Sequence, residues 1–452
     1  MLFALAATQR PSSVPAPWKA TSPLRPSLDS PQALSLREVE ALVEKVGVAL
    51  HAYGCSSPRL EATLSELTAR LGAEGHFFST PTAIFAAIGS GEERKTLLLR
   101  TEPGEVNLDK LSRLNRVLDR LFAGELAVNT AARRVDRILA APSRYSTRAM
   151  IVSFALTSAC AAHFFGGSLL DFLLAGLLGL GIGLLTLTLG WVGKRLPTAP
   201  RMFETASGLF TAAAAFALAQ LGLELQVPTV LLASLIVLVP GFTVTVAMHE
   251  LAMRHLVSGS ARLAGAILVF LTMGFGVALG SGLGQSVPAS SLLAMDASST
   301  LLTSSLATLF GGWAWAADGL ALAGAAVGFT VLFGAAPKDG PWILGAATLA
   351  LLGSRGGAAA LGPELGAAAG ALAVGLAGNA FARTLGRPST VLQIPGLMLL
   401  VPGSVGFRGV SSLLEQDALA GVQGAFTMIL LAAALVAGLL MANVLLPPRR
   451  SL

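Results

Sequence analysis

Two proline–glycine pairs interrupt apolar, helix-length segments of the chain. Residues 231–246 read LLASLIVLVPGFTVTV, with Pro240-Gly241 near the end, and Leu-Val-Pro-Gly returns 162 residues later at Pro402-Gly403. Proline lacks a backbone N–H and clashes with the preceding turn, so each helix is expected to bend or break there. In a membrane, the freed carbonyl groups need protein or a polar cavity around them. The freed carbonyls and the helix ends at the two breaks are therefore candidates for substrate binding, and helix N-termini favour a carboxylate.

Three polar side chains inside apolar segments are further candidates for substrate binding. A carboxylate in a bilayer is costly and usually faces a cavity or a partner, so Asp318 could contact a substrate amine or carry a proton. Alternatively, Asp318 lies near the outer end of its segment, beside Trp313 and Trp315. Thr243 follows the first break and could bind substrate or bond back to its own helix. Asn379 could bind substrate or serve only as a hydrogen-bonding group between helices.

The composition indicates a membrane protein. Of 452 residues, 54% are hydrophobic and 12% charged, and the mean hydropathy is +0.71. A soluble protein of this size carries about twice that charge. The net charge is +6 and the basic residues lie mostly beside apolar segments, which favours membrane topology over nucleic-acid binding. The two cysteines, Cys55 and Cys160, give neither a disulfide framework nor a metal cluster, and we expect no metal and no cofactor.

Hydrophobic segments predict an α-helical polytopic membrane protein with about ten transmembrane helices. Most segments reach the roughly 20 apolar residues that a bilayer crossing needs. Ten crossings put almost all loop Lys and Arg on one side, which predicts cytoplasmic N- and C-termini in the plasma (inner) membrane. The seventh segment is interrupted at Arg355-Gly356-Gly357, and the ninth has an additional break at Pro395-Gly396. The segments are 149–169, 171–193, 202–222, 228–247, 262–283, 304–333, 341–361, 364–384, 390–407 and 419–446.

The two breaks belong to a longer internal correspondence. At nearly the same offset Arg195 matches Arg355, Gly208 matches Gly370 and Gly259 matches Gly421. We therefore predict two five-helix repeats, 149–283 and 304–446, joined by an extracytoplasmic loop at 284–303. An odd number of crossings makes the repeats inverted, and inverted repeats with discontinuous helices commonly give transporters alternating access to a central site.

The chain before the first hydrophobic segment divides into two parts. Residues 1–32 are rich in Pro, Ser and Ala and are expected to form a disordered tail. Residues 33–142 are expected to form a small cytoplasmic α+β domain, because helical and strand-like patterns alternate with turn residues. The predicted helices are 34–52, 58–71, 107–121 and 124–139, and the predicted strands are 76–79, 83–88 and 95–100.

Residues 51–61 are the densest polar cluster of this domain. A His with a Ser or Cys suggests a nucleophile and its base, as in a hydrolase. The alternative is a helix C-cap at Gly54, an N-cap at Ser56 or Ser57, and an interaction surface. Farther along, Glu250 and Arg254 have the i,i+4 spacing of an ion pair on a surface helix. The residues of the cluster singled out are His51, Tyr53, Gly54, Ser56, Arg59 and Glu61.

The sequence resembles the threonine/serine exporter family over about 33–446. The likeness consists of the cluster at 51–61, Thr80-x-Thr82 before a strand, the Leu-Val-Pro-Gly helix with its later copy, and ten segments after a cytoplasmic domain. The resemblance implies export of L-threonine and L-serine driven by the proton motive force, and it carries the idea that the soluble domain resembles a hydrolase. Cys55 falls in a variable position of the motif and receives no role from it.

Two classes of function follow. The first is a secondary transporter, not an enzyme, that exports small polar amino acids across the bilayer, with homo-oligomerisation left open. No Walker loop is present, since Gly89-Ser90-Gly91 is only a turn, and coupling to protons is favoured over ATP. The second is a membrane-embedded hydrolase or peptidase with its catalytic group in the N-terminal domain, and export of another small metabolite such as a dicarboxylate is a further alternative.

Overall fold

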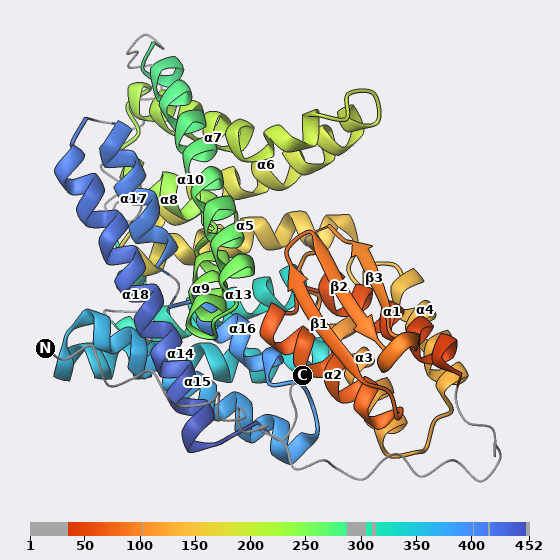
Figure 1. The fold of residues 1–452 in the computed structure, drawn as a ribbon. Coiled ribbons are helices and arrows are strands. Elements are labelled where there is room, and N and C mark those ends of the chain that lie inside the picture. Colours follow the sequence, from red (N-terminus) through yellow and green to blue (C-terminus); the bar gives the residue numbers. More distant parts are fainter. Residues whose placement is uncertain are drawn as a thin grey trace, which may run out of the picture.

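The chain folds into a bundle of long helices with a smaller helix-and-sheet unit on one side (Figure 1). The computed structural model describes residues 35–102, 104–286, 304–309, 313–400, 402–414 and 416–448. The predicted tail at 1–32 and most of the predicted loop at 284–303 lie outside these residues.

The N-terminal unit is a three-stranded antiparallel sheet with four helices. Strands pair in the order β1-β2-β3, and Phe78, Phe85 and Leu98 are register partners on the exposed face. The helices pack behind the sheet (Figure 1) around a core that includes Leu42, Leu64 and Ile84. All three predicted strands and all four predicted helices are confirmed within a few residues. The elements are α1 (Leu36–Ala52), α2 (Ser57–Arg70), β1 (Gly75–Thr80), β2 (Ala83–Ile88), η1 (Gly91–Glu93), β3 (Lys95–Arg100), α3 (Leu108–Phe122) and α4 (Val128–Ala140).

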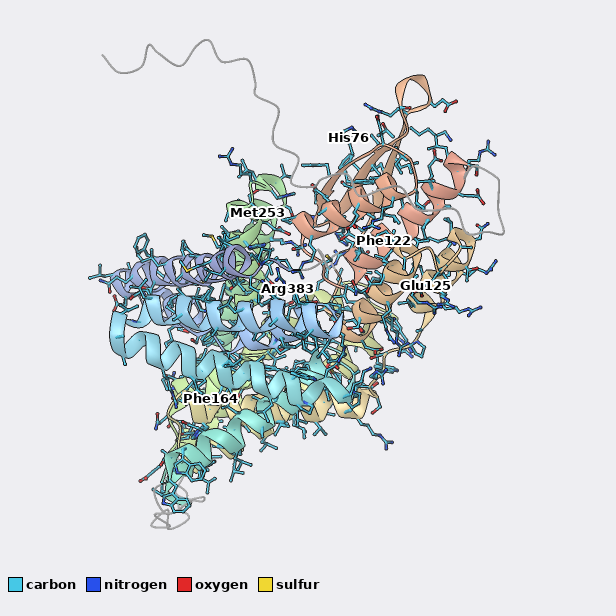
Figure 2. All side chains as sticks on the ribbon, turned by 90° about the horizontal axis from the view of Figure 1, so that it is seen from below. His76, Phe122, Glu125, Phe164, Met253 and Arg383 are labelled. Carbon is cyan, nitrogen blue, oxygen red and sulfur yellow. The ribbon has the colours of Figure 1, made fainter. Side chains whose placement is uncertain are left out.

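The rest of the described chain is helical, and eight helical segments in it are long and apolar enough to cross a membrane. This confirms a polytopic α-helical membrane protein. Phe164, at the end of α5, lies far from the sheet, whereas Arg383 lies close to the N-terminal unit (Figure 2). The elements are α5 (Thr147–Phe164), α6 (Leu169–Gly193), η2 (Ala199–Met202), α7 (Phe203–Gln220), α8 (Val227–Leu235), α9 (Gly241–Ala252), α10 (Leu256–Gln285), α12 (Leu306–Leu309), α13 (Ala314–Leu332), η4 (Pro337–Asp339), α14 (Gly340–Leu361), α15 (Pro363–Leu385), α16 (Thr390–Met398), α17 (Gly403–Leu414) and α18 (Ala418–Leu445).

Two of the predicted interruptions are confirmed and two are wrong. The chain leaves the helix between α8 and α9 at Pro240, and between α16 and α17 before Gly403. Pro395 instead lies inside α16, and Arg355-Gly356-Gly357 continue α14 without a break. Glycine alone costs a helix only about 1 kcal/mol, so packing against α15 is sufficient to keep α14 continuous.

The helix contacts of the first half recur in the second. The helix α7 packs on α10 as α15 packs on α18, and α9 packs on α10 as α17 packs on α18. The match extends to single atoms. A Cβ on Gly259 would lie 2.7 Å from Leu251 Cγ, and a Cβ on Gly421 would lie 2.3 Å from Leu413 Cγ, which is the same pair 162 residues later.

The N-terminal unit is joined to the bundle by backbone hydrogen bonds. The first amides of α3 donate to the carbonyls of the two residues that follow α13: Leu108 N to Phe333 O at 2.9 Å and Asp109 N to Gly334 O at 3.2 Å. These are the groups that a helix leaves unsatisfied at its N- and C-terminus. The positive end of one helix dipole therefore meets the negative end of another.

Close helix packing predicts a position-dependent response to a single methyl group. A Cβ at Gly276 in α10 would lie 2.1 Å from the Thr205 carbonyl oxygen of α7, whereas Gly265 on the same helix has open space. We expect Gly276→Ala to destabilise the protein by about 1–3 kcal/mol through overpacking. Gly265→Ala, the matched control, should be neutral or slightly stabilising, and thermal unfolding in detergent measures both. Equal melting temperatures for the two variants would contradict this packing.

Candidate functional site

The two Pro-Gly breaks meet in the buried interior of the bundle. A Cβ on Gly403 would lie 2.4 Å from Val239 Cγ1 and 3.3 Å from the Cα of Gly241. The two interrupted helices therefore touch at the positions where each is interrupted. This contact needs glycine, because any side chain at 403 would occupy the space that the other break fills.

The first break leaves backbone and hydroxyl groups close to this contact. Gly241 N donates to Val239 O at 2.8 Å, which forms a tight turn at Pro240. Thr245 Oγ1 donates back to Gly241 O at 3.1 Å, so its hydroxyl belongs to its own helix. Thr243 is half-buried, and among the described residues its hydroxyl has no hydrogen-bond partner. Of the two threonines, Thr243 is therefore the one available to a ligand.

Asp318 forms a separate polar cluster that links three helices. Its carboxylate accepts from His163 Nε2 on α5 at 3.0 Å and from Arg355 on α14 at 2.5 Å. Asp318 lies near the start of α13, just after Trp313 and Trp315, as the second interpretation of the sequence expected. Its polar partners are on α5 and α14, and neither break contributes to them.

Asn379 is fully buried on α15 and connects three helices. Its side-chain amide donates to Asn443 Oδ1 and to Leu446 O, both at 2.8 Å, and its oxygen accepts from Gln393 Nε2 at 3.2 Å. These bonds use both donors of the amide and one of the two acceptor positions of its oxygen. The arrangement is interhelical hydrogen bonding, the alternative to substrate contact that the sequence left open.

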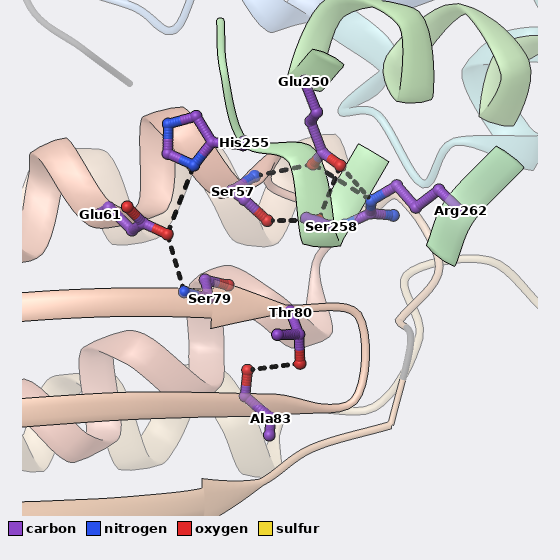
Figure 3. Close-up of polar contacts among 9 residues, drawn as sticks. All are labelled: Ser57, Glu61, Ser79, Thr80, Ala83, Glu250, His255, Ser258 and Arg262. Carbon is purple, nitrogen blue, oxygen red and sulfur yellow. Dashed lines mark hydrogen bonds and ion pairs between the residues drawn. The ribbon is translucent and has the colours of Figure 1, made fainter. Parts of the chain in front are cut away.

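The N-terminal cluster docks onto the turn between α9 and α10 through a buried carboxylate. Glu250, at the end of α9, is 0% exposed. It accepts from Ser57 N at 2.9 Å, from Ser258 Oγ at 2.7 Å and from Arg262 Nε at 3.1 Å (Figure 3). Ser57 is the first residue of α2, so a carboxylate from the bundle caps a helix of the N-terminal unit.

The expected surface pair between Glu250 and Arg254 is wrong. Arg254 follows the end of α9 and adopts a positive φ of 65°, and its side chain is exposed. The chain reverses there, and Arg262 from α10 returns to pair with Glu250. A buried carboxylate requires a charged partner and hydrogen bonds, and here a neighbouring helix and the N-terminal unit supply them.

A second carboxylate, which belongs to the N-terminal unit, contacts the bundle in return. Glu61 on α2 accepts from the Ser79 amide at 2.7 Å, and His255 Nδ1 lies 3.5 Å from the same oxygen (Figure 3). Burial raises the pKa of Glu61 above its usual value. Glu61 thus holds the end of β1 and also the turn before α10.

Two further residues of the cluster, His51 and Tyr53, have hydrogen-bond partners inside the unit. His51 Nε2 donates to Thr80 O at 3.2 Å, and Tyr53 Oη donates to Ile138 O at 3.2 Å. Gly54 has a φ of +76° that a side chain would strain, and Ser56 precedes α2 without a side-chain cap bond. His51 therefore hydrogen-bonds the β1–β2 hairpin, and neither Ser56 nor Cys55 is its partner in the described chain.

Arg59 begins a polar chain into the bundle. Its guanidinium lies 3.4 Å from Ser389 Oγ, and Ser389 donates to Gln393 Oε1 at 3.3 Å. Gln393 in turn bonds Asn379. The cluster at 51–61 is therefore connected to α15, α16 and α18 by hydrogen bonds. Among the described residues, no group of three or more His, Cys, Asp or Glu side chains could hold a metal ion.

Removal of the Glu250 charge should release the N-terminal unit. Breaking a buried ion pair by removing one partner costs about 3–5 kcal/mol, because the other charge stays buried. Cys55 is buried close to this contact, and burial raises the pKa of its thiol to about 11, so at pH 8 it should react slowly. In a Cys160→Ala background, we expect Glu250→Gln to raise the rate of maleimide labelling of Cys55 at least tenfold. The exposed Glu224→Gln is the control, and equal labelling rates in the two variants would refute docking through Glu250.

The buried His51 should make stability depend on pH. Burial lowers the pKa of His51 below 6.5, so the folded state favours the neutral ring. Below pH 6.5 the unfolded chain binds a proton that the folded chain excludes, and stability should fall by up to about 1.4 kcal/mol per pH unit. Denaturant unfolding between pH 7.5 and 5.5 should show a smaller loss in His51→Gln than in wild type. The exposed His76→Gln should retain the wild-type pH dependence, and the same dependence in all three proteins would exclude His51 as its source.

Comparison with known proteins gives matches along most of the chain. Models of the threonine/serine exporter family match residues 41–284 and 318–445. A "Threonine/serine exporter" from Corynebacterium glutamicum is 26% identical over 439 residues, which cover 93% of this chain and 84% of that protein. No solved structure matches.

Fungal relatives match a shorter region. The "Pheromone-regulated membrane protein 10" of Debaryomyces hansenii is 27% identical over 240 residues, or 52% of this chain and 23% of that protein. Its Saccharomyces cerevisiae counterpart is 27% identical over 239 residues, or 52% of this chain and 30% of that protein. The matched region thus spans about a quarter of the length of these relatives. Since the first family model alone covers more than half of the sequence, the chain belongs to the threonine/serine exporter family.

Proposed function

We propose that this protein is a secondary transporter that exports L-threonine, L-serine and similar small polar amino acids from the cytoplasm. Membership of the exporter family and the similarity to the Corynebacterium exporter support this substrate class. The structural observation that supports this mechanism is the contact between the two Pro-Gly breaks, where Gly403 approaches Val239 and Gly241. Interrupted helices that meet in this way are typical of transporter binding sites near the middle of the bilayer.

The proposed architecture is ten membrane crossings arranged as two inverted five-helix repeats, 149–283 and 304–446. The recurrence of helix contacts and the matched Gly259–Leu251 and Gly421–Leu413 pairs support it. Contacts between the halves are also reciprocal, since α9 packs on α18 and α17 packs on α10. In this arrangement both termini and the N-terminal unit, 33–142, face the cytoplasm.

The proposed substrate site lies beside the breaks, and the Asp318 cluster has another role. The helices α9 and α17 begin at Gly241 and Gly403, and the positive ends of their dipoles favour the substrate carboxylate. The Thr243 hydroxyl is free to contact the polar substrate. Asp318 lies near the start of α13, where it is bound by His163 and Arg355. We propose that it transfers the proton that couples export to the proton motive force.

A compensating pair of substitutions tests the site. Gly403→Ala places a methyl group 2.4 Å from Val239 Cγ1, which costs about 1–3 kcal/mol if the helices must separate. We expect efflux of labelled threonine and serine from loaded vesicles to fall about tenfold. Val239→Ala removes the clashing methyl group, so the double variant Val239→Ala/Gly403→Ala should recover most of the rate.

Three further outcomes decide the proposal. An uncoupler should stop wild-type efflux, and Asp318→Asn should lose the response to the uncoupler if Asp318 transfers the proton. Efflux that survives Gly403→Ala unchanged would move the substrate site away from the breaks. No efflux of either amino acid by the wild type would refute the substrate assignment.

A further inference from the structure

A basic cavity lies where the N-terminal unit meets the bundle. It has a volume of about 390 Å³, within the range of small-molecule sites, and is lined by α3, the segment before α5, η4 and the α15–α16 connection. Two carboxylates, Asp109 and Asp339, neutralise only part of its charge. The cationic residues that line it are Arg113, Arg116, Arg144, Lys338 and Arg387.

The ion pairs divide these cations into two groups. Asp109 binds both Arg113, at 2.7 Å, and Arg144, at 3.0 Å, while Asp339 binds Arg387. Within the described chain, Arg116 donates only to the Ser112 carbonyl, at 3.4 Å, and Lys338 has no ion pair. Positive charges confined in one cavity repel each other, so an anion there would be strongly attracted.

A neutral group in the cavity wall also lacks a partner. Ser112 is 7% exposed, and its hydroxyl has no hydrogen-bond partner in the described part of the protein. Buried hydroxyls are almost always bonded, so an unsatisfied one in a cavity lining indicates a missing ligand or water. An oxygen-rich anion would accept from this hydroxyl and from the arginines together.

The position of the cavity indicates the source of the anion. The apolar helices α5 and α16 begin beside it, and α13 and α15 end beside it, so it lies at the level of a membrane surface. Leu385, 48% exposed, forms an apolar part of the same wall. Basic cavities between helices at the membrane surface suit anionic phospholipid head groups.

We propose that this cavity binds a phosphate-bearing anion, either the head group of an anionic phospholipid or free phosphate. The backbone bonds from α3 to α13 and the Tyr145 hydroxyl bond to Ala335 O, at 2.7 Å, fix its walls. Because the cavity has walls from both units, a bound anion stabilises the docked arrangement of the N-terminal unit. The anion is a ligand in addition to the transported amino acid.

The test uses the full chain in neutral detergent with three probes: phosphatidylglycerol, phosphatidylcholine and inorganic phosphate. Binding to the folded state raises the melting temperature, and its concentration dependence gives an apparent Kd. Arg116→Gln/Lys338→Gln removes the two cations that have no carboxylate partner. Each charge near an anionic lipid contributes about 1 kcal/mol, so we expect phosphatidylglycerol affinity to fall roughly 25-fold in this variant.

The matched control is Arg37→Gln/Arg100→Gln, which removes two exposed charges from the N-terminal unit and should bind as wild type does. If the double variant folds poorly without lipid, Lys338→Gln alone, at an exposed position, should still weaken binding about fivefold.

The probes distinguish the two sources of the anion. Stabilisation by phosphatidylglycerol alone identifies a lipid head group, and equal stabilisation by inorganic phosphate identifies free phosphate. The proposal is overturned if neither anion stabilises the wild type more than phosphatidylcholine does. It is also overturned if the cavity variants respond to both anions as the control does.

Discussion

The arrangement of the two units depends on one buried carboxylate. Glu250 has no contact with solvent, and an unpaired charge in such a place would be too costly to persist. Three groups from two helices satisfy it: Arg262 and Ser258 from α10, and the Ser57 amide from α2. The same carboxylate therefore couples three processes. These are folding of the α9–α10 turn, capping of α2 and docking of the N-terminal unit.

The contact between the breaks imposes a different constraint, because it leaves no room for a side chain at Gly403. Two continuous helices with side chains at their crossing point keep their axes about 8–10 Å apart. Here Gly403 and Gly241 allow the chains to approach within van der Waals distance. The cost is four helix ends inside the bundle whose amides and carbonyls need partners. A polar substrate can supply such partners, which an uninterrupted helix could not use.

The sequence predicted those elements whose causes are local. Pro240 breaks its helix because the missing N–H and the ring clash act within one turn, and turn residues separate the three strands. The predicted break at Pro395 was wrong, because tertiary packing outweighs the same local penalty in α16. The pairing of Glu250 could not be read from spacing, since the i,i+4 rule favoured Arg254 whereas the chain reversal brings Arg262. The sequence did contain one signal of a buried contact, a glutamate at the end of an apolar segment. Its partner Ser57, however, lies 193 residues away in the sequence.

The separation of these partners along the chain has a consequence for biosynthesis. The N-terminal unit leaves the ribosome first, yet Ser57 must wait for Glu250, 193 residues later, and Arg59 must wait for Ser389, 330 residues later. Glu250 belongs to the first half of the bundle and can contact Ser57 early, but until the second half has been inserted Arg59 lacks its partner Ser389. Docking of the α2 surface that Ser57 and Arg59 share can therefore be complete only after synthesis and insertion of the chain are complete. A chain truncated after the first five helices would keep the part of that surface around Arg59 open to chaperones and proteases.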